Sequence, residues 1–464
     1  MDVFSSVLAF MWLVYFWDTY LSSRQHKVYE NVRKLPDELE SVIDQTNFEK
    51  ARNYALDRSS YGFWHGLYSQ CESTFILCFN GIPLLWMLSG KLLESMGLSE
   101  DSEITHSLLF IVLGGVISTI LSLPWSLYST FVIEERHGFN KMTLGFYLKD
   151  LVKKFVVTQL ITIPLISLII YVIQIGGDYF FVYAWAMIFV FLLIIMHVYP
   201  EYIAPLFDKY TPLPDGELKS KIEELASSLK FPLKKLFVVE GSKRSAHSNA
   251  YLYGFHKNKR IVLYDTLLED YSPVEKTEPE SPKEDDKGDQ AVGDETETAP
   301  QTKPEKKKIG CNNDEVVAIL GHELGHWKFS HTLKQLAISQ VSILFSFFLF
   351  GKLMNQSILF SAFGFVDVQP TLIKLLIVFS YIFSPINEVE SVLVNLMTRR
   401  FEYQADEFSV GLGKRDNLKM ALLKLFKDNS GFPVDDWLYS ICHLSHPSLL
   451  ERVRAMDRIK YKSE

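Results

Sequence analysis

Seven apolar stretches constrain the fold of this 464-residue chain more than any other feature. Each is long enough, or nearly long enough, to cross a bilayer, since a membrane-spanning helix needs about 20 mostly apolar residues. They lie at 4–21, 72–90, 107–133, 155–175, 179–199, 333–351 and 371–396. So many long apolar stretches do not fit the core of a soluble protein of this size. The sequence therefore predicts a mainly α-helical integral membrane protein with seven transmembrane helices.

The first apolar stretch is typical of either a cleaved signal peptide or a retained anchor. The residues before it, Met1-Asp2-Val3, lack the basic charge that precedes the apolar region of a signal peptide, and the stretch itself is long. We therefore expect a retained signal-anchor helix.

The charges of the loops predict the orientation of the chain. Basic residues such as Arg33 and Lys154 follow the first and third stretches, whereas acidic residues such as Glu94 and Asp367 follow the second and sixth. Because cytosolic loops are enriched in Lys and Arg, we expect a lumenal N-terminus. Seven spans then place the C-terminus and the region 201–332 in the cytosol or nucleoplasm.

Composition excludes some classes of function. The net charge is −8, from 47 basic and 55 acidic residues, so the chain lacks the basic charge that is typical of nucleic-acid-binding proteins. The cysteines form no C-x-x-C pair, so we expect reduced thiols rather than disulfides; they are Cys71, Cys78, Cys311 and Cys442. Residues 272–308 are polar, acidic and free of aromatic residues, which predicts a disordered insert.

The segment His322-Glu323-Leu324-Gly325-His326 carries the chemistry. Two histidines four apart on a helix project from one face and can bind one Zn²⁺. The glutamate beside the first histidine can activate the attacking water as a general base. Two unrelated histidines on a helix surface are the alternative, but the pattern arises rarely by chance.

A catalytic zinc needs a third protein ligand, and the best candidate lies directly after the seventh stretch. Glu402 and Asp406 are four apart on a predicted helix, so one carboxylate can bind metal while the other orients a ligand histidine. Read alone, the pair is typical of a solvated acidic face. His331 lies near the motif but on a different helix face, so we expect it to be structural or exposed.

The region before the motif predicts a small sheet. We expect a helix at 219–229, a strand at 236–239 and a β-hairpin spanning 251–264. An exposed edge strand beside a zinc helix could bind extended peptide by β-augmentation. Three further residues are candidates for contacts with substrate: His446 for the oxyanion, and Asn249 and Arg452 for the peptide backbone. Each, in isolation, is typical of a structural polar residue.

Several dispersed motifs together resemble the CAAX prenyl protease 1 family, integral-membrane zinc metallopeptidases of the endoplasmic reticulum and inner nuclear membrane. The resemblance runs almost end to end, except in the acidic insert. The motifs are Leu123-Pro124-Trp125-Ser126-Leu127-Tyr128, Phe131-Val132-Ile133-Glu134-Glu135, His137-Gly138-Phe139-Asn140, Ile203-Ala204-Pro205-Leu206-Phe207-Asp208-Lys209, Val239-Glu240-Gly241-Ser242-Lys243-Arg244, Gly321-His322-Glu323-Leu324-Gly325-His326-Trp327, Phe401-Glu402-Tyr403-Gln404-Ala405-Asp406 and Ser445-His446-Pro447 with Glu451-Arg452.

The resemblance implies a hollow barrel of seven membrane helices capped by a gluzincin-like zinc metallopeptidase domain. The chain would divide into four regions. Membrane helices 1–5 would lie in 1–200 and helices 6–7 in 333–396. The cytosolic metallopeptidase domain would be formed by 201–332 and, as its C-terminal part, 397–464. The resemblance also implies roles for the candidate residues. The zinc ligands would be His322, His326 and Glu402, with Glu323 as general base. Asp406 would contact the ligands without binding the metal, and the substrate would be surrounded by Asn249, His446 and Arg452.

The implied substrate is a C-terminal tetrapeptide whose cysteine is farnesylated or geranylgeranylated, cut after that cysteine. If the source is an animal, the family also implies a second, upstream cut in prelamin A. A prenylated C-terminus resides at a membrane surface, so membrane lipid is the other expected partner.

Two rival interpretations remain at this point. A membrane metallopeptidase that clears misfolded or stalled membrane proteins would share every motif. A seven-span receptor or transporter with a structural zinc would need a fourth protein ligand, for which Cys311 is the nearest candidate.

Overall fold

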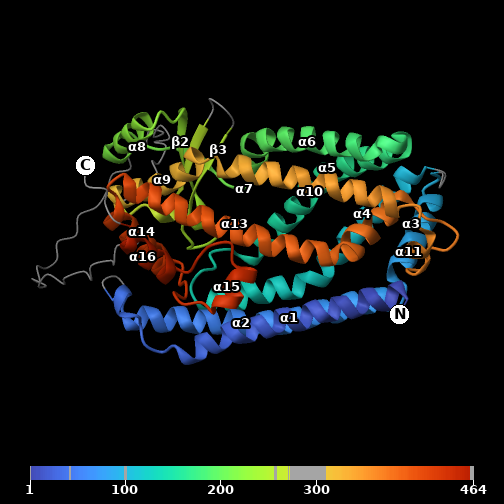
Figure 1. Ribbon diagram of the computed structural model, residues 1–464, viewed down its shortest axis with the longest axis horizontal. Helices are drawn as coiled ribbons and strands as arrows, with labels where there is room; N and C mark the ends of the chain where they lie inside the picture. Colours follow the sequence, from blue (N-terminus) through green and yellow to red (C-terminus); the bar gives the residue numbers. More distant parts are fainter. Residues whose placement is uncertain are drawn as a thin grey trace, which may run out of the picture.

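The computed structural model describes residues 2–40, 43–98, 102–254, 259–269, 271 and 310–459. Long helices run along the longest axis of the molecule, and a small sheet with several shorter helices lies at one end (Figure 1). The N-terminus lies at the opposite end. The insert predicted at 272–308 lies outside the described residues.

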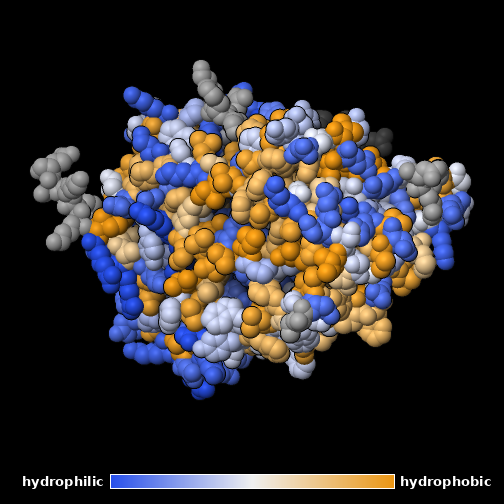
Figure 2. All heavy atoms as spheres, turned by 45° about the vertical axis from the view of Figure 1, so that its right-hand side comes forward, coloured by the Kyte–Doolittle hydropathy of each residue, from blue (hydrophilic) through white to orange (hydrophobic). Residues whose placement is uncertain are grey.

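The long helices account for the predicted membrane segments. They are α1 (Val3–Asn31), α2 (Gln45–Cys78), α3 (Gly81–Ser95), α4 (Glu103–Tyr128), α5 (Leu144–Ile175), α6 (Phe180–Val198), α10 (His331–Leu353) and α13 (Ser384–Gly411). Among the described residues, five helical segments are long and apolar enough to cross a membrane, and two bent pairs bring the number to as many as seven. Large apolar side chains on them face outward, as Leu160 and Val341 do with 69% and 70% exposure, and apolar residues cover much of the face in Figure 2.

Two of the predicted spans are not single straight helices. Within 72–90 the chain bends by 66° between α2 and α3. Asn80 adopts a left-handed conformation there, with φ of +55°, and a side chain at Gly81 would meet the Ile76 carbonyl oxygen at 2.9 Å. The glycine permits this close approach.

The seventh predicted span, 371–396, bends by 59°. Helix α12 (Thr371–Ile377) continues into a π-turn at Val378–Ile382, and α13 then begins at Ser384 with Pro385 in its first turn. Proline lacks an N–H and favours the start of a helix. The helix therefore restarts at this point, and periodicity alone did not predict the bend.

The sheet contains the predicted hairpin. Its four strands are β1 (Tyr210–Pro212), β2 (Leu233–Val239), β3 (Ala250–Tyr253) and β4 (Lys259–Tyr264), in the order β1-β2-β4-β3. β3 and β4 are antiparallel, with Ala250 opposite Leu263 and Tyr253 opposite Arg260. β4 runs parallel to β2. The helix predicted at 219–229 is confirmed as α8 (Glu217–Ser228), and the strand predicted at 236–239 is confirmed as part of β2. The strand β1 was not predicted. β3 is an edge strand.

Helix α9 (Asn313–Lys328) lies at the centre of this end of the molecule. A capping box between Asn312 and Glu315 starts it, and its buried residues, such as Leu320, join one core with Ile222 of α8 and Ile261 of β4. It also packs on α13 and on α14 (Arg415–Asp428). The remaining helices are α7 (Ala204–Phe207), α11 (Ser357–Ser361), α15 (Trp437–His443) and α16 (Leu449–Arg458).

Candidate metal centre

Two glycines bring α9 and α13 unusually close together. A β-carbon at Gly321 would lie 2.9 Å from the Ser409 hydroxyl oxygen, and one at Gly325 would lie 3.0 Å from the α-carbon of Ala405. Ser409 also donates a hydrogen bond from its hydroxyl to the Ala318 carbonyl, at 3.0 Å. The contact places the α13 carboxylates directly opposite the α9 histidines.

Three candidate ligands converge where the two helices meet. The Nε2 atoms of His322 and His326 are 3.1 Å apart, and carboxylate oxygens of Glu402 lie 3.5 Å and 3.3 Å from them. Ligand atoms around a tetrahedral zinc, with bonds of about 2.0–2.1 Å, lie about 3.3 Å from one another. The donor set and its spacing therefore fit a metal ion.

A buried carboxylate orients the first histidine. His322 places Nδ1 2.9 Å from Asp406, which lets Nδ1–H donate and leaves the Nε2 lone pair directed at the candidate metal position. Burial opposes protonation of His322, but the hydrogen bonds to Asp406 and Glu402 outweigh it and raise its pKa to about 9. Since ligand histidines must be neutral, metal and protons compete at this residue.

His331 is buried and orients the second histidine, which agrees with the structural role that was one of the two expectations from the sequence. Its Nδ1 lies 2.9 Å from Nδ1 of His326, its Nε2 lies 3.0 Å from the Gln404 side-chain oxygen, and its ring stacks on Phe401. Because the Gln404 oxygen only accepts, His331 accepts in turn from His326 Nδ1–H, and His326 keeps its Nε2 lone pair. The prediction that His331 lies on a different helix face from the motif was wrong, because α9 ends at Lys328 and α10 begins at His331, after Ser330 turns the chain with φ of +55°.

Two further candidates lie close to the ligands. Glu323 is partly buried, and burial raises the pKa of its carboxyl group, which suits a general base working near neutral pH. His446 is 64% exposed and places Nε2 3.4 Å from Glu402, while its Nδ1 lies 2.8 Å from the Ser445 hydroxyl. His446 is therefore accessible to a substrate at this site.

The two candidates for binding the peptide backbone occupy different places. Arg452 is buried and forms hydrogen bonds to Asp406 at 2.6 and 2.8 Å, with Nη1 3.5 Å from Glu402. It thus lies behind the ligands and offsets the charge of their carboxylates. Asn249 lies just before the edge strand β3 and lines a cavity of about 900 Å³.

Cys311 lies away from the candidate ligands. It is buried in the core beneath α9, eleven residues before His322, which corresponds to about 17 Å along a helix. Burial raises the pKa of its thiol to about 12. The fourth ligand that a closed structural site would need is therefore not supplied by this cysteine.

Comparisons with known proteins are consistent with this site. A family model described as CAAX prenyl protease N-terminal, five membrane helices, matches residues 25–209, and the model of peptidase family M48 matches residues 212–460. The chain is 54% identical to the CAAX prenyl protease 1 homolog of Mus musculus over 459 residues, which cover 99% of this chain and 96% of that protein. The Homo sapiens protein of the same name is also 54% identical, over 460 residues, with the same coverage.

A solved structure shares the fold over nearly the whole chain. The crystal structure of S. mikatae Ste24p superposes with a TM-score of 0.82 at 32% sequence identity, covering 98% of this chain and 99% of that one. The helical architecture and the arrangement of the peptidase region are therefore common to both proteins.

Proposed function

The chain belongs to the CAAX prenyl protease 1 family of M48 metallopeptidases, multi-pass membrane enzymes that process CAAX proteins, and from this premise we propose that it is a zinc endopeptidase that removes the C-terminal tripeptide of prenylated CAAX proteins. The observation that carries the proposal is the convergence of His322, His326 and Glu402 within 4.8 Å of one another, with Glu323 beside them. Histidine nitrogens and a carboxylate oxygen are ligands typical of catalytic zinc.

The mechanism assigns a separate task to each residue of the site. His322, His326 and Glu402 would hold zinc, which supplies Lewis-acid activation of water and of the scissile carbonyl. Glu323 takes the proton from the attacking water and then delivers it to the amine of the leaving tripeptide. His446 donates from Nε2 to the oxygen that gains negative charge. Asp406 and His331 hold the ligand histidines in the required tautomers.

Substrate binding is proposed at the edge of the sheet. The outer edge of β3 has no strand partner among the described residues, so an extended peptide can add to it by backbone hydrogen bonds. Asn249, directly before β3, is our candidate for a side-chain contact with the substrate backbone. The position of Arg452 behind Asp406 and Glu402 supports an indirect electrostatic role better than direct contact with substrate.

We place the enzyme in the endoplasmic reticulum membrane and the inner nuclear membrane. Its N-terminus would be lumenal, and its metal site would lie on the cytosolic or nucleoplasmic side. The loop charges support this orientation. So does the position of the N-terminus at the end of the molecule opposite α9 (Figure 1). A prelamin A-like protein is a further substrate that this location would suit.

The test compares a farnesylated C-terminal peptide with the same peptide lacking the lipid, using purified protein in detergent with and without a zinc chelator. The proposal expects chelator-sensitive cutting of the lipidated peptide and little cutting of the other. Equal cutting of both would retain the metalloprotease chemistry but favour the broader function in clearing membrane proteins.

A further inference from the structure

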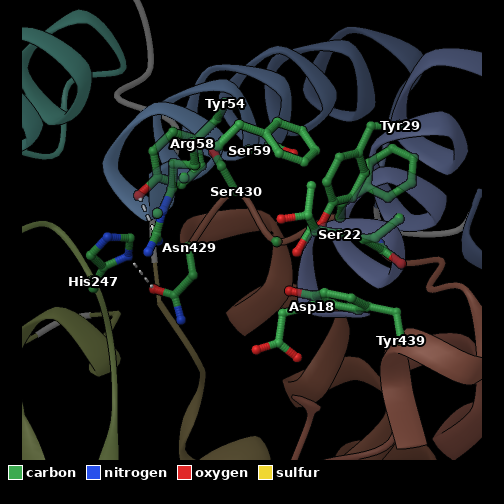
Figure 3. A pocket seen from close by; sticks show the side chains of 18 of the residues that line it. Asp18, Ser22, Tyr29, Tyr54, Arg58, Ser59, His247, Asn429, Ser430 and Tyr439 are labelled. Carbon is green, nitrogen blue, oxygen red and sulfur yellow. Dashed lines mark hydrogen bonds between the residues drawn. The ribbon is translucent and has the colours of Figure 1, made fainter. Parts of the chain in front are cut away.

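A polar cavity of about 900 Å³ lies next to the start of β3 (Figure 3). Residues of α1 and α2 form one side, and His247, Ser248 and Asn249 form part of the other. Building on the proposed function, we propose that this cavity binds the free C-terminal carboxylate of the substrate, and that Arg58 on α2 is the cation that recognises it.

The direction of β3 determines where the substrate's C-terminus lies. β3 runs from Ala250 to Tyr253 as an edge strand. A peptide that pairs with it in the antiparallel sense runs the opposite way, and antiparallel pairing is the more stable and more frequent kind. Its C-terminal part therefore leaves the sheet at Ala250 and continues toward the cavity wall.

The leaving tripeptide would lie beside residues that line the cavity. Three extended residues span about 10 Å. If the scissile bond lies level with Ala250, the three positions beside the tripeptide are Asn249, Ser248 and His247, all of which line the cavity. The terminal carboxylate then falls near His247, and the side chain of Arg58 is directed toward this residue from the opposite side of the cavity (Figure 3).

Arg58 is available to bind an anion there. It is exposed, its Nη1 donates to the Tyr54 hydroxyl at 3.3 Å, and its guanidinium lies over the Tyr54 ring. Among the described residues no carboxylate is paired with it. Figure 3 shows its side chain directed toward His247 and Asn429. A guanidinium held on an aromatic ring keeps its remaining N–H groups available for a two-point bond to a carboxylate.

Two acidic residues lie nearby, and neither forms an ion pair with Arg58, although Glu134 attracts it at longer range. Glu134 accepts a hydrogen bond from the Tyr54 hydroxyl at 2.7 Å and faces His247 at 3.6 Å. Asp18 lies well apart from Arg58 in Figure 3 and faces His443 at 3.6 Å. Arg58 is therefore the cation in this cavity best placed to recognise a chain end.

The experiment uses two farnesylated peptides of identical sequence, one ending in a free carboxylate and one in an amide, and full-length protein in detergent. The readout is the ratio of kcat/KM for the acid to that for the amide. We expect the unaltered protein to favour the acid by about 10- to 100-fold, as for loss of a charge-assisted hydrogen bond. Arg58→Met should bring the ratio close to one, and Arg58→Lys should restore part of the preference.

Arg33→Met is the matched control, because Arg33 is exposed, does not line the cavity, and its side chain makes one weak hydrogen bond, to the Glu30 carbonyl. The acid-to-amide ratio of this variant should stay that of the unaltered protein. A ratio measured within one preparation does not depend on the fraction of folded enzyme. An undiminished acid preference in Arg58→Met, or no preference in the unaltered protein, would overturn the assignment and leave the protease function intact. Failure of the unaltered protein to cut either peptide would instead overturn the proposed function.

Discussion

Asp406 and Arg452 form a buried two-point ion pair beside the candidate metal ligands, with Nε–Oδ2 and Nη2–Oδ1 distances of 2.8 and 2.6 Å. The same carboxylate lies 2.9 Å from Nδ1 of His322. Asp406 thus links a fixed positive charge to a ligand histidine, and the pair holds His322 in the tautomer that a metal requires.

Asp406→Asn should weaken metal binding while preserving the shape of the site. Loss of the carboxylate removes the charge that supports the Nδ1–H tautomer of His322, and such changes typically cost about 10- to 100-fold in metal affinity. Competition with a chromophoric chelator measures the change. Asp416→Asn, at an exposed position on α14, is the control, and equal affinities for the two variants would contradict the role of Asp406.

Gly325→Val should separate α9 from α13 and impair the site. The added side chain would begin 3.0 Å from the α-carbon of Ala405, so α13 must move and carry Glu402 away from the histidines. We expect loss of bound zinc, measured by elemental analysis of purified protein. Gly411→Val, at the end of α13, has open space around it and should retain its zinc. A fully loaded Gly325→Val protein would refute this explanation of the close contact.

His446→Ala should lower kcat with little change in metal content. Its Nε2 lies 3.4 Å from Glu402 and its side chain is accessible, so we expect it to stabilise the negative charge that develops on the substrate oxygen. Removing such a contribution typically lowers kcat by about 100-fold or more. Steady-state kinetics with the farnesylated peptide, together with zinc analysis, separate the two effects. A higher KM at unchanged kcat would instead indicate a role in binding alone.

The stability of the enzyme should depend on Asp435. Burial, together with the nearby Glu451, raises its pKa to about 6, above the value of about 3.9 expected in the unfolded chain. A carboxyl group with a raised pKa stabilises the fold fully below about pH 4, and this contribution is lost as pH rises through about 6. Asp435→Asn, which can still accept the Gln25 hydrogen bond, should therefore unfold at a higher temperature than the unaltered protein at pH 7.5 and at the same temperature near pH 4. Thermal scans in detergent at both pH values test this, and a difference of equal size at the two values would show that Asp435 does not titrate as described.

Local sequence patterns predicted the features that depend on periodicity. The apolar stretches, the hairpin that includes Tyr251, and the spacing of His322 and His326 each follow from a repeat along one helix or strand. The spacing of Glu402 and Asp406 predicted a third ligand among these two carboxylates, and the family resemblance implied Glu402, which the structure brings beside both histidines.

Features that depend on how separate segments meet were not predictable in the same way. His331 contacts His326 because the chain turns at Ser330, so that the two residues do not lie on one continuous helix. Arg452 reaches Asp406 only because α16 packs on α13, and Arg58 and His247 line one cavity although they lie far apart along the chain. The spacing of residues within one segment carries no information about such contacts.

The central claim is that the α9–α13 site is a metal centre in which Glu323 acts as the general base. Its most direct test measures zinc content and turnover of the farnesylated peptide on the same preparations of the unaltered protein and of Glu323→Gln. We predict about one zinc per chain in both proteins, and turnover at least about 100-fold lower in the variant. Near-normal hydrolysis by Glu323→Gln with zinc bound would contradict the account.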